Sequence, residues 1–266
     1  MVNLLVAAAL AAATPTPAQP SPLPAEPALF VVRDDDTTVY IFGTFHALDS
    51  HTQWFGDRVR NAFEESNELV LETIIPEKQP MAPPAAAGRF RPPSVTPSAS
   101  FLATTRMAIN AGRARGMQVD NGADMILRHA AEAEGKPVEG LETLQLQIDM
   151  FNRMPPAPSP EAKAHHDAAS PSQVDGLSRA MADMQTAWKR GDQSVFVRML
   201  GQLKTASPDT YRMMFTERNS RWADWVRARM QSPGTVFIAV GAGHLAGPDS
   251  LLVGLAERGL PSQRVY

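Results

Sequence analysis

TVFIAVGAGH, residues 235–244, is the stretch of sequence that decides the fold. Its first six residues form a nearly continuous apolar run, which is typical of a strand covered on both faces of a sheet. Gly241 and Gly243 then end the run, and His244 comes just after them. A helix expected near 250–258 and a last strand near 263–266 would complete a strand–helix–strand crossover.

A second crossover is predicted near the N-terminal end of the chain. A strand at 28–32, an acidic turn at 34–36 and a strand at 37–42 predict a hairpin. A helix from about 56 to 66 then leads to the apolar run 68–72, expected as a buried strand. The expected fold class is therefore α/β (α+β), a central mixed, partly parallel sheet with two βαβ-type units, flanked by helices and a helical middle insertion.

Further helices and Pro-rich loops are expected around these two units. Helices are expected near 101–115 and 121–134, followed by a short strand at 137–139 and a helix that opens around Glu142. Three more helices are expected near 174–190, 193–204 and 209–231. Eighteen of the 23 prolines fall in three patches, and repeated proline indicates linkers or surface loops. The expected organisation is a signal peptide and Pro-rich leader at 1–27, then a single domain at 28–266 with Pro-rich loops at about 76–99 and 153–172.

Composition excludes several classes of site and partner. The formal net charge of -3, with both signs interspersed, gives no electrostatic footprint for nucleic acid. Because the chain has no cysteine, any metal must be held by histidine and carboxylate. The apolar run 1–13 ends in three alanines, which is typical of a signal peptide and predicts an exported protein, periplasmic or secreted. Since no other run approaches about 18 apolar residues, the mature form is expected to have no membrane span.

Two Gly-x-x-His strings follow expected strands, GTFH at 43–46 and GAGH at 241–244. In open sheets with parallel strands, ligands bind beyond the carboxyl ends of the strands, and both His46 and His244 are expected there. Glycine at a strand end allows a sharp turn or a positive φ, so that the histidine three residues later can fold back over the sheet edge. The sequence therefore predicts that the two histidines meet.

Glu72 ends the strand expected to run parallel to the one before His46, and it would reach the same edge. Two imidazoles and a carboxylate suit a divalent metal ion with open positions for water and substrate. His51 is either a fourth ligand or, as we favour, a solvated loop residue. The candidate catalytic and metal-binding residues are therefore His46, Glu72 and His244.

Arg218 lies within an aromatic stripe on the helix expected at 209–231. At alternating spacings of four and three residues, the stripe runs through Tyr211, Phe215, Arg218, Trp222 and Trp225. A guanidinium on such a core-facing seam needs a buried acceptor. Two interpretations are open: a structural ion pair with Glu72 or Glu142, which the periodicity favours, or a clamp on a substrate carboxylate or phosphate.

Taken together, these residues resemble the TraB/GumN family, which includes the Tiki proteases of animals. The resemblance runs from about Ala28 to Tyr266 and rests on the order of four short blocks. The blocks are YIFGTFH at 40–46 with ELVLE at 68–72, GKPVEGLET at 135–143 with Gln147, Arg218-Asn219, and VGAGHL at 240–245 with Gly247.

The resemblance implies a metal-dependent hydrolase of peptide or amide bonds. It makes His46 and His244 metal ligands and Glu72 a ligand or base, with Arg218, Asn219 and Glu142 as supporting, substrate-binding residues. Manganese or cobalt is the ion that the likeness to Tiki implies, and zinc is a further candidate. Two alternatives stay open: a metal-free His/Glu hydrolase, as in the similar erythromycin-esterase group, or a non-catalytic protein that binds a peptide or glycan.

Overall fold

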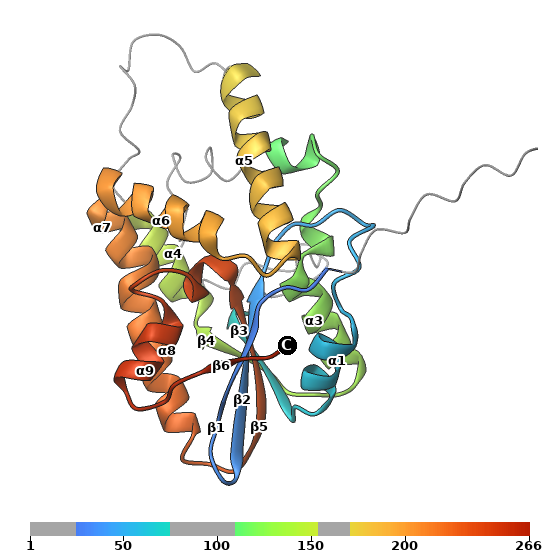
Figure 1. Cartoon of the computed structure of the whole chain (residues 1–266), viewed down its shortest axis with the longest axis vertical. Coiled ribbons are helices and arrows are strands. Elements are labelled where there is room, and N and C mark those ends of the chain that lie inside the picture. The colour runs from blue at the N-terminus through green and yellow to red at the C-terminus, as the bar shows by residue number, and fades with distance from the viewer. Residues whose placement is uncertain (1–24, 75–109, 154–170) are drawn as a thin grey trace, which may run out of the picture.

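A six-stranded sheet forms the centre of the molecule (Figure 1). The computed structural model describes residues 25–74, 110–153 and 171–266. In chain order the strands are β1 (Leu29–Arg33), β2 (Thr37–Thr44), β3 (Glu68–Thr73), β4 (Val138–Glu142), β5 (Gly234–Gly241) and β6 (Gln263–Arg264). Across the sheet their order is β4-β3-β5-β2-β1-β6, so β5, the strand from which the sequence argument began, lies inside it.

The sheet is mixed, as predicted. Strand β5 pairs in parallel with β2 on one side and β3 on the other, and β3 pairs in parallel with β4. Strand β1 is antiparallel to both β2 and β6, which confirms the hairpin. Consequently β2, β3, β4, β5 and β6 all point one way, and both strand–helix–strand crossovers are confirmed.

Helices cover both faces of the sheet and its carboxyl end. They are α1 (Asp57–Glu64), α3 (Ala123–Ala133), α4 (Leu144–Arg153), α5 (Pro171–Lys189), α6 (Ser194–Ala206), α7 (Pro208–Tyr211), α8 (Glu217–Arg229) and α9 (Leu251–Glu257). A π-helical segment, Arg212–Thr216, joins α7 to α8. Helices α1 and α3 lie on one side of the sheet and α8 and α9 on the other, while α5 and α6 lie across the end (Figure 1).

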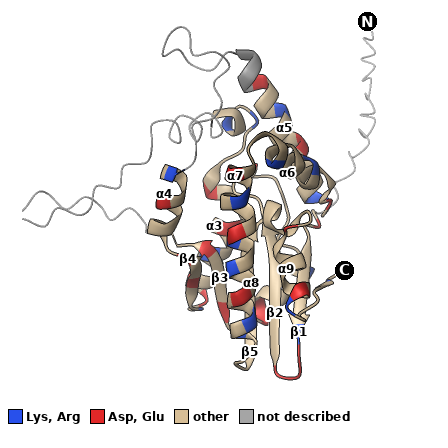
Figure 2. Ribbon diagram, turned by 90° about the vertical axis from the view of Figure 1, so that its left-hand side faces the viewer, with Lys and Arg blue, Asp and Glu red and all other residues tan. Residues whose placement is uncertain are grey.

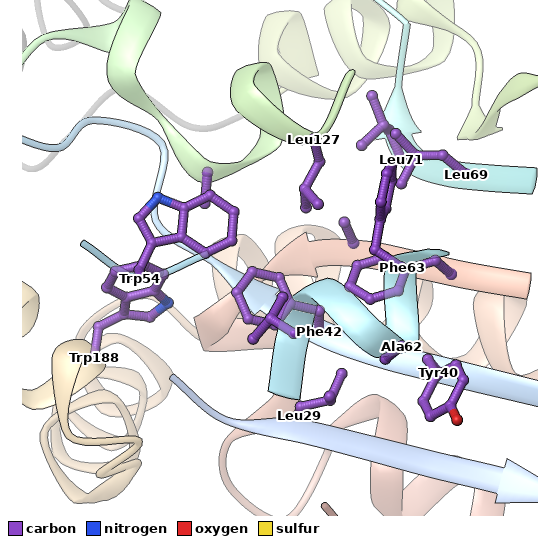
Figure 3. Close-up of a cluster of buried hydrophobic side chains, with 14 of the residues drawn as sticks. Leu29, Tyr40, Phe42, Trp54, Ala62, Phe63, Leu69, Leu71, Leu127 and Trp188 are labelled. Atoms are coloured by element: carbon purple, nitrogen blue, oxygen red, sulfur yellow. The ribbon is translucent and has the colours of Figure 1, made fainter. Parts of the chain in front are cut away.

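Each face of the sheet has its own hydrophobic core because side chains of a strand alternate between faces. Phe237 belongs to the core under α1, α3 and α5, whereas Ile238 belongs to the core under α8 and α9. In the first core, Phe42 stacks on Trp54 with ring centroids 5.3 Å apart, beside Trp188 (Figure 3). The prediction that β5 is covered on both faces is therefore confirmed.

Two predicted element boundaries were wrong. Glu142 ends strand β4 and does not open a helix, since the helix α4 begins after Thr143, whose hydroxyl accepts a hydrogen bond from Leu146 N (3.2 Å). The single helix expected at 209–231 is divided by the π-helical segment. A π-helical turn inserts one residue into a helix, and periodicity alone does not reveal it.

Several predictions fall on residues outside the described ranges. These are the signal peptide, most of the Pro-rich leader, the Pro-rich loop at about 76–99, most of the loop at about 153–172 and the first part of the helix near 101–115. Among the residues that are described, no helix is long and apolar enough to cross a membrane. Acidic and basic residues are interspersed over the described helices, as Figure 2 shows.

Candidate functional site

The two Gly-x-x-His turns lie side by side at the carboxyl edge of the sheet. Thr44 pairs with Gly241 in the register of β2 and β5, so the turns leave neighbouring strands at the same level. His244 sits in a short 3-10 turn after β5, and Glu72 comes from β3 on the other side of β5. The structure therefore places His46, His244 and Glu72 at the same edge of the sheet, as predicted.

The glycines of these turns serve close approach, and positive φ is not needed. Gly241 has φ -52° and ψ 135°, and Gly43 is not among the described glycines with positive φ. A Cβ on Gly43 would lie 3.2 Å from Ala242 Cα, so the two turns pack directly against each other. The sequence suggested that glycine allows either a sharp turn or a positive φ, and the expectation of a positive φ was wrong at both positions.

Gly241 also leaves room at the centre of the site. A Cβ built on it would lie 3.1 Å from Glu72 Oε1, 3.2 Å from His46 Nε2 and 3.8 Å from His244 Cδ2. We call this space, bounded by His46, Glu72, Gly241 and His244, the cradle. All three predicted catalytic side chains border it.

Replacing Gly241 with alanine is expected to lower the free energy of unfolding by about 1–3 kcal/mol through overpacking. The backbone angles suit alanine, but Glu72 is held by Arg218 and by the Gly241 amide and cannot easily yield. Urea unfolding measures the change. The matched control is Gly56→Ala, where nothing lies within 4 Å of the added Cβ. Equal stability of the two variants would contradict the cradle.

Hydrogen bonds fix the tautomer of His244. Arg218 Nη1 donates to His244 Nε2 (3.1 Å), so the ring proton is on Nδ1, which donates to Asn219 Oδ1 (2.6 Å). Asn219 is oriented in turn because its Nδ2 donates to the Asp249 carbonyl (2.7 Å). The result is a neutral imidazole with a lone pair on Nε2, the form that binds metals or accepts a proton.

His46 is oriented in the same way by a residue that the sequence did not indicate. Its Nδ1 donates to Asp124 Oδ1 (3.1 Å), which leaves Nε2 directed at the cradle. Asp124 lies in the first turn of α3, and Gly122 packs against the His46 carbonyl to bring that helix in. An acidic residue in a first helical turn is common everywhere, so the sequence offers no specific signal for Asp124.

Arg218 binds both candidate acids, which confirms the structural interpretation. Its Nη2 donates to Glu72 Oε2 (2.6 Å), and its Nε donates to both carboxylate oxygens of Glu142 (3.1 and 3.0 Å). Arg221 adds a bond to Glu142 (3.1 Å) from the surface side. The Arg218 side chain is only 4% exposed, and its guanidinium bonds are made within the protein. It is therefore not an open clamp for a substrate anion.

The charges of the site follow from these contacts. Burial alone would raise the pKa of Glu72, but His244, Arg218 and His46 outweigh it and lower the pKa to about 2. Burial lowers the pKa of His244 to about 3, because the attraction of Glu72 is offset by Arg218. At neutral pH the cradle therefore presents a carboxylate and a neutral imidazole.

His46 behaves differently because it is paired with the carboxylate of Asp124. Partial loss of hydration would lower its pKa, but the hydrogen bond and charge of Asp124, with Glu72, raise the pKa to about 9. Since the side chain is 61% exposed, water screens the pair and its contribution to stability is small. A raised pKa means that this contribution is present below about pH 6.5 and is lost as the pH rises through 9.

A pocket of about 510 Å³ opens above the cradle. Its floor consists of His46, Glu72, Gly241 and His244 with Thr44, Thr73 and Arg218, and Asp124 lines it as well. His51 is exposed and does not line the pocket, in keeping with the favoured interpretation of a solvated loop residue. Asn219 and Glu142 lie behind the pocket, where they contact His244 and Arg218. Neither residue is part of the pocket lining, and their contact with substrate stays a prediction.

The donor set of the cradle suits a divalent cation in chemistry. Two imidazoles with oriented Nδ1 atoms and a carboxylate are a familiar ligand set, and the space that a Cβ on Gly241 would fill is bordered by His46 Nε2, Glu72 Oε1 and His244 Cδ2. In the described part of the chain, however, no three His, Asp or Glu side chains already have ligand spacing. Arg218 occupies His244 Nε2 and Glu72 Oε2, so holding an ion would require His244 to exchange that hydrogen bond.

The fold and the site together define a class: an α/β protein with two contacting Gly-x-x-His turns, a strand-end glutamate and a buried arginine at one edge of a mixed sheet. The model of the TraB/PrgY/gumN family matches residues 28–92 and 85–264, and the chain belongs to this family. No curated protein and no solved structure matches the chain with significance.

Proposed function

We propose that the protein hydrolyses peptide or other amide bonds with the help of a divalent metal ion held by His46, Glu72 and His244. The observation that supports this most directly is the shared orientation of the two histidines. Each is held through Nδ1 by a protein acceptor, Asp124 or Asn219, so that His46 Nε2 is directed at the cradle, while His244 Nε2 would be available to an ion once it exchanges its bond from Arg218. Acceptors of this kind orient metal-binding histidines and raise their basicity.

The protein's own residues divide the remaining work. A bound ion would supply Lewis acidity and lower the pKa of a water molecule. Where Glu72 is not itself a tight ligand, it would accept the proton of the attacking water, since it is ionised at neutral pH, and deliver that proton to the leaving nitrogen. Arg218 keeps Glu72 ionised and positions it through the 2.6 Å bond. Phe215, whose ring centroid lies 4.9 Å from that of His244, helps to hold the imidazole in place.

A metal-free hydrolase is the second candidate, and the bond between Arg218 Nη1 and His244 Nε2 favours it. That bond occupies the lone pair that a metal ion would need. In this alternative Glu72 and His46 activate water directly, without an ion. A peptide substrate and export from the cell both stay predictions from the sequence.

Metal uptake by the purified protein separates the two candidates. After stripping with a chelator, wild type is expected to take up one equivalent of Mn²⁺, Co²⁺ or Zn²⁺ and to regain hydrolysis of internally quenched peptide pools. His46→Ala and His244→Ala are expected to weaken metal affinity by more than about 100-fold. His51→Ala is the matched control, since His51 is exposed and lies outside the pocket lining.

Each other outcome has a defined meaning. Full hydrolysis by the stripped protein would replace the metal site by the metal-free mechanism. Equal metal uptake by wild type, His46→Ala and His244→Ala would show that the ion binds elsewhere. If the protein showed no metal uptake and no hydrolysis, the interpretation left would be a binding protein without catalysis, and the proposal would be withdrawn.

A further inference from the structure

The pocket above the cradle has a wall that is chemically unlike its floor. The wall consists of Met181 from α5, Phe196 and Met199 from α6, and Met214 and Phe215 from the π-helical segment. We call these five residues the apolar wall. All five are thioethers or phenyl rings, so the wall offers no charge and no strong hydrogen-bonding group to a ligand.

The floor carries charges of both signs, and one of its cationic groups, His46, keeps Nε2 directed at the cradle. Among the described lining residues the cationic candidates are Arg218 and His46. Each of the three guanidinium nitrogens of Arg218 already donates to a protein acceptor, and His46 is bonded to Asp124. The carboxylates of Glu72 and Asp124 face the same pocket and would repel an anionic ligand.

Two uncharged polar atoms on the floor are without a partner among the described residues. They are the hydroxyls of Thr44 and Thr73, which end β2 and β3 on either side of β5. Buried polar groups are nearly always hydrogen-bonded, so an orphaned hydroxyl in a pocket lining indicates a missing partner. A neutral amide, with one donor and one acceptor, would satisfy such hydroxyls without bringing a charge.

From these observations we infer that the pocket binds an uncharged, apolar segment of the substrate, with apolar side chains against the apolar wall, where a charged side chain would find no partner. This inference rests on the proposed function, since it names the substrate class of the same site. The volume of about 510 Å³ lies within the range of about 300–1,000 Å³ typical of small-ligand sites. Three methionines from three different elements make the wall adaptable, so it selects apolar character over one exact shape.

Blocked tetrapeptides test the inference by calorimetry on the full chain. The probes are acetyl-Gly-Leu-Leu-Gly-amide, acetyl-Gly-Gln-Gln-Gly-amide and acetyl-Gly-Glu-Glu-Gly-amide, which share a backbone and differ in two side chains. Wild type is expected to bind the leucine probe about tenfold or more tightly than the other two, because burying a leucine side chain is worth at least that factor. His46→Ala, measured in parallel, provides a form without turnover.

Matched variants on α6 locate the binding surface. Met199→Glu is expected to weaken binding of the leucine probe by about tenfold or more, whereas Met199→Leu stays within about threefold. Val197→Glu is the control, since Val197 lies on the same helix, is 42% exposed and is not part of the pocket lining. If Met199→Glu fails to fold by circular dichroism, Met181→Gln on α5 carries the same test.

The outcomes separate this inference from the proposed function. Equal affinity for the leucine and glutamate probes, or equal effects of Met199→Glu and Val197→Glu, would overturn the inference even if peptides are cleaved. Preferential binding of the leucine probe without cleavage of any peptide would uphold the inference and overturn the hydrolase.

Discussion

Arg218→Met is expected to lower the free energy of unfolding by about 3–5 kcal/mol, the loss that follows when one partner of a buried ion pair is removed. Glu142 has a side chain that is 2% exposed, and Arg218 is its buried partner through two bonds. Methionine has a similar length but no charge, so the variant would leave Glu142 and Glu72 close together with their main counter-charge gone.

Arg221→Ala is the control for this prediction, because Arg221 binds the same Glu142 but is 49% exposed. A surface partner of this kind is worth less than about 1 kcal/mol. Urea unfolding of the two variants gives the comparison. The double variant Arg218→Met with Glu142→Gln should recover part of the loss, since it removes one of the orphaned charges. Similar losses in Arg218→Met and Arg221→Ala would mean that the Arg218 network is not the stabilising element we describe.

Glu72→Gln is expected to reduce peptide hydrolysis by about 100- to 10,000-fold, the usual contribution of a general base. Glutamine is nearly the same shape, and its single oxygen can still accept the bond from Arg218 Nη2, although the amide nitrogen that replaces Oε1 loses the bond from the Gly241 amide. It cannot take a proton from water. The fold should therefore persist while turnover is lost, and steady-state kinetics with a circular dichroism spectrum would show both.

Glu68→Gln is the matched control, at the other end of the same strand β3. Glu68 also pairs with an arginine, Arg229 (2.9 Å), but at the amino end of the strand, away from the cradle. Its replacement is expected to change turnover by less than about twofold. If both variants retain full turnover, Glu72 is not the base, and the proposed mechanism fails at that step.

The fold could be predicted from the sequence wherever the pattern of apolar residues decided the structure. The continuous run in β5 and the short run in β3 indicated buried strands, and the helix between β2 and β3 indicated that those two strands run parallel. The π-helical segment Arg212–Thr216 could not be predicted, since a stripe with spacings of four and three fits a plain helix equally well. The end of β4 at Glu142 was missed because an acidic residue there also suits a helix start.

The candidate site was predictable only in part, for a related reason. Strand direction placed His46, His244 and Glu72 on one edge, and the aromatic stripe marked Arg218 as buried. Asp124 was missed because its role depends on how α3 docks beside His46, which no local pattern encodes. The sequence offered positive φ as one reason for glycine at 241, whereas the structure shows that the space is needed by Glu72 and His46. Those side chains come from the ends of two other strands, so the residues around Gly241 in the sequence do not reveal the need.

The π-helical segment also sets the rotational phase between two parts of one continuous helical rod. Met214 and Phe215 lie in the π turn and face the pocket, while Arg218 follows one turn later and is anchored to the sheet edge. One residue fewer in this turn would rotate everything before it by about 100° around the helix axis and leave Arg218 where it is. The apolar wall and the position of Arg218 can therefore change independently, although a single backbone carries both.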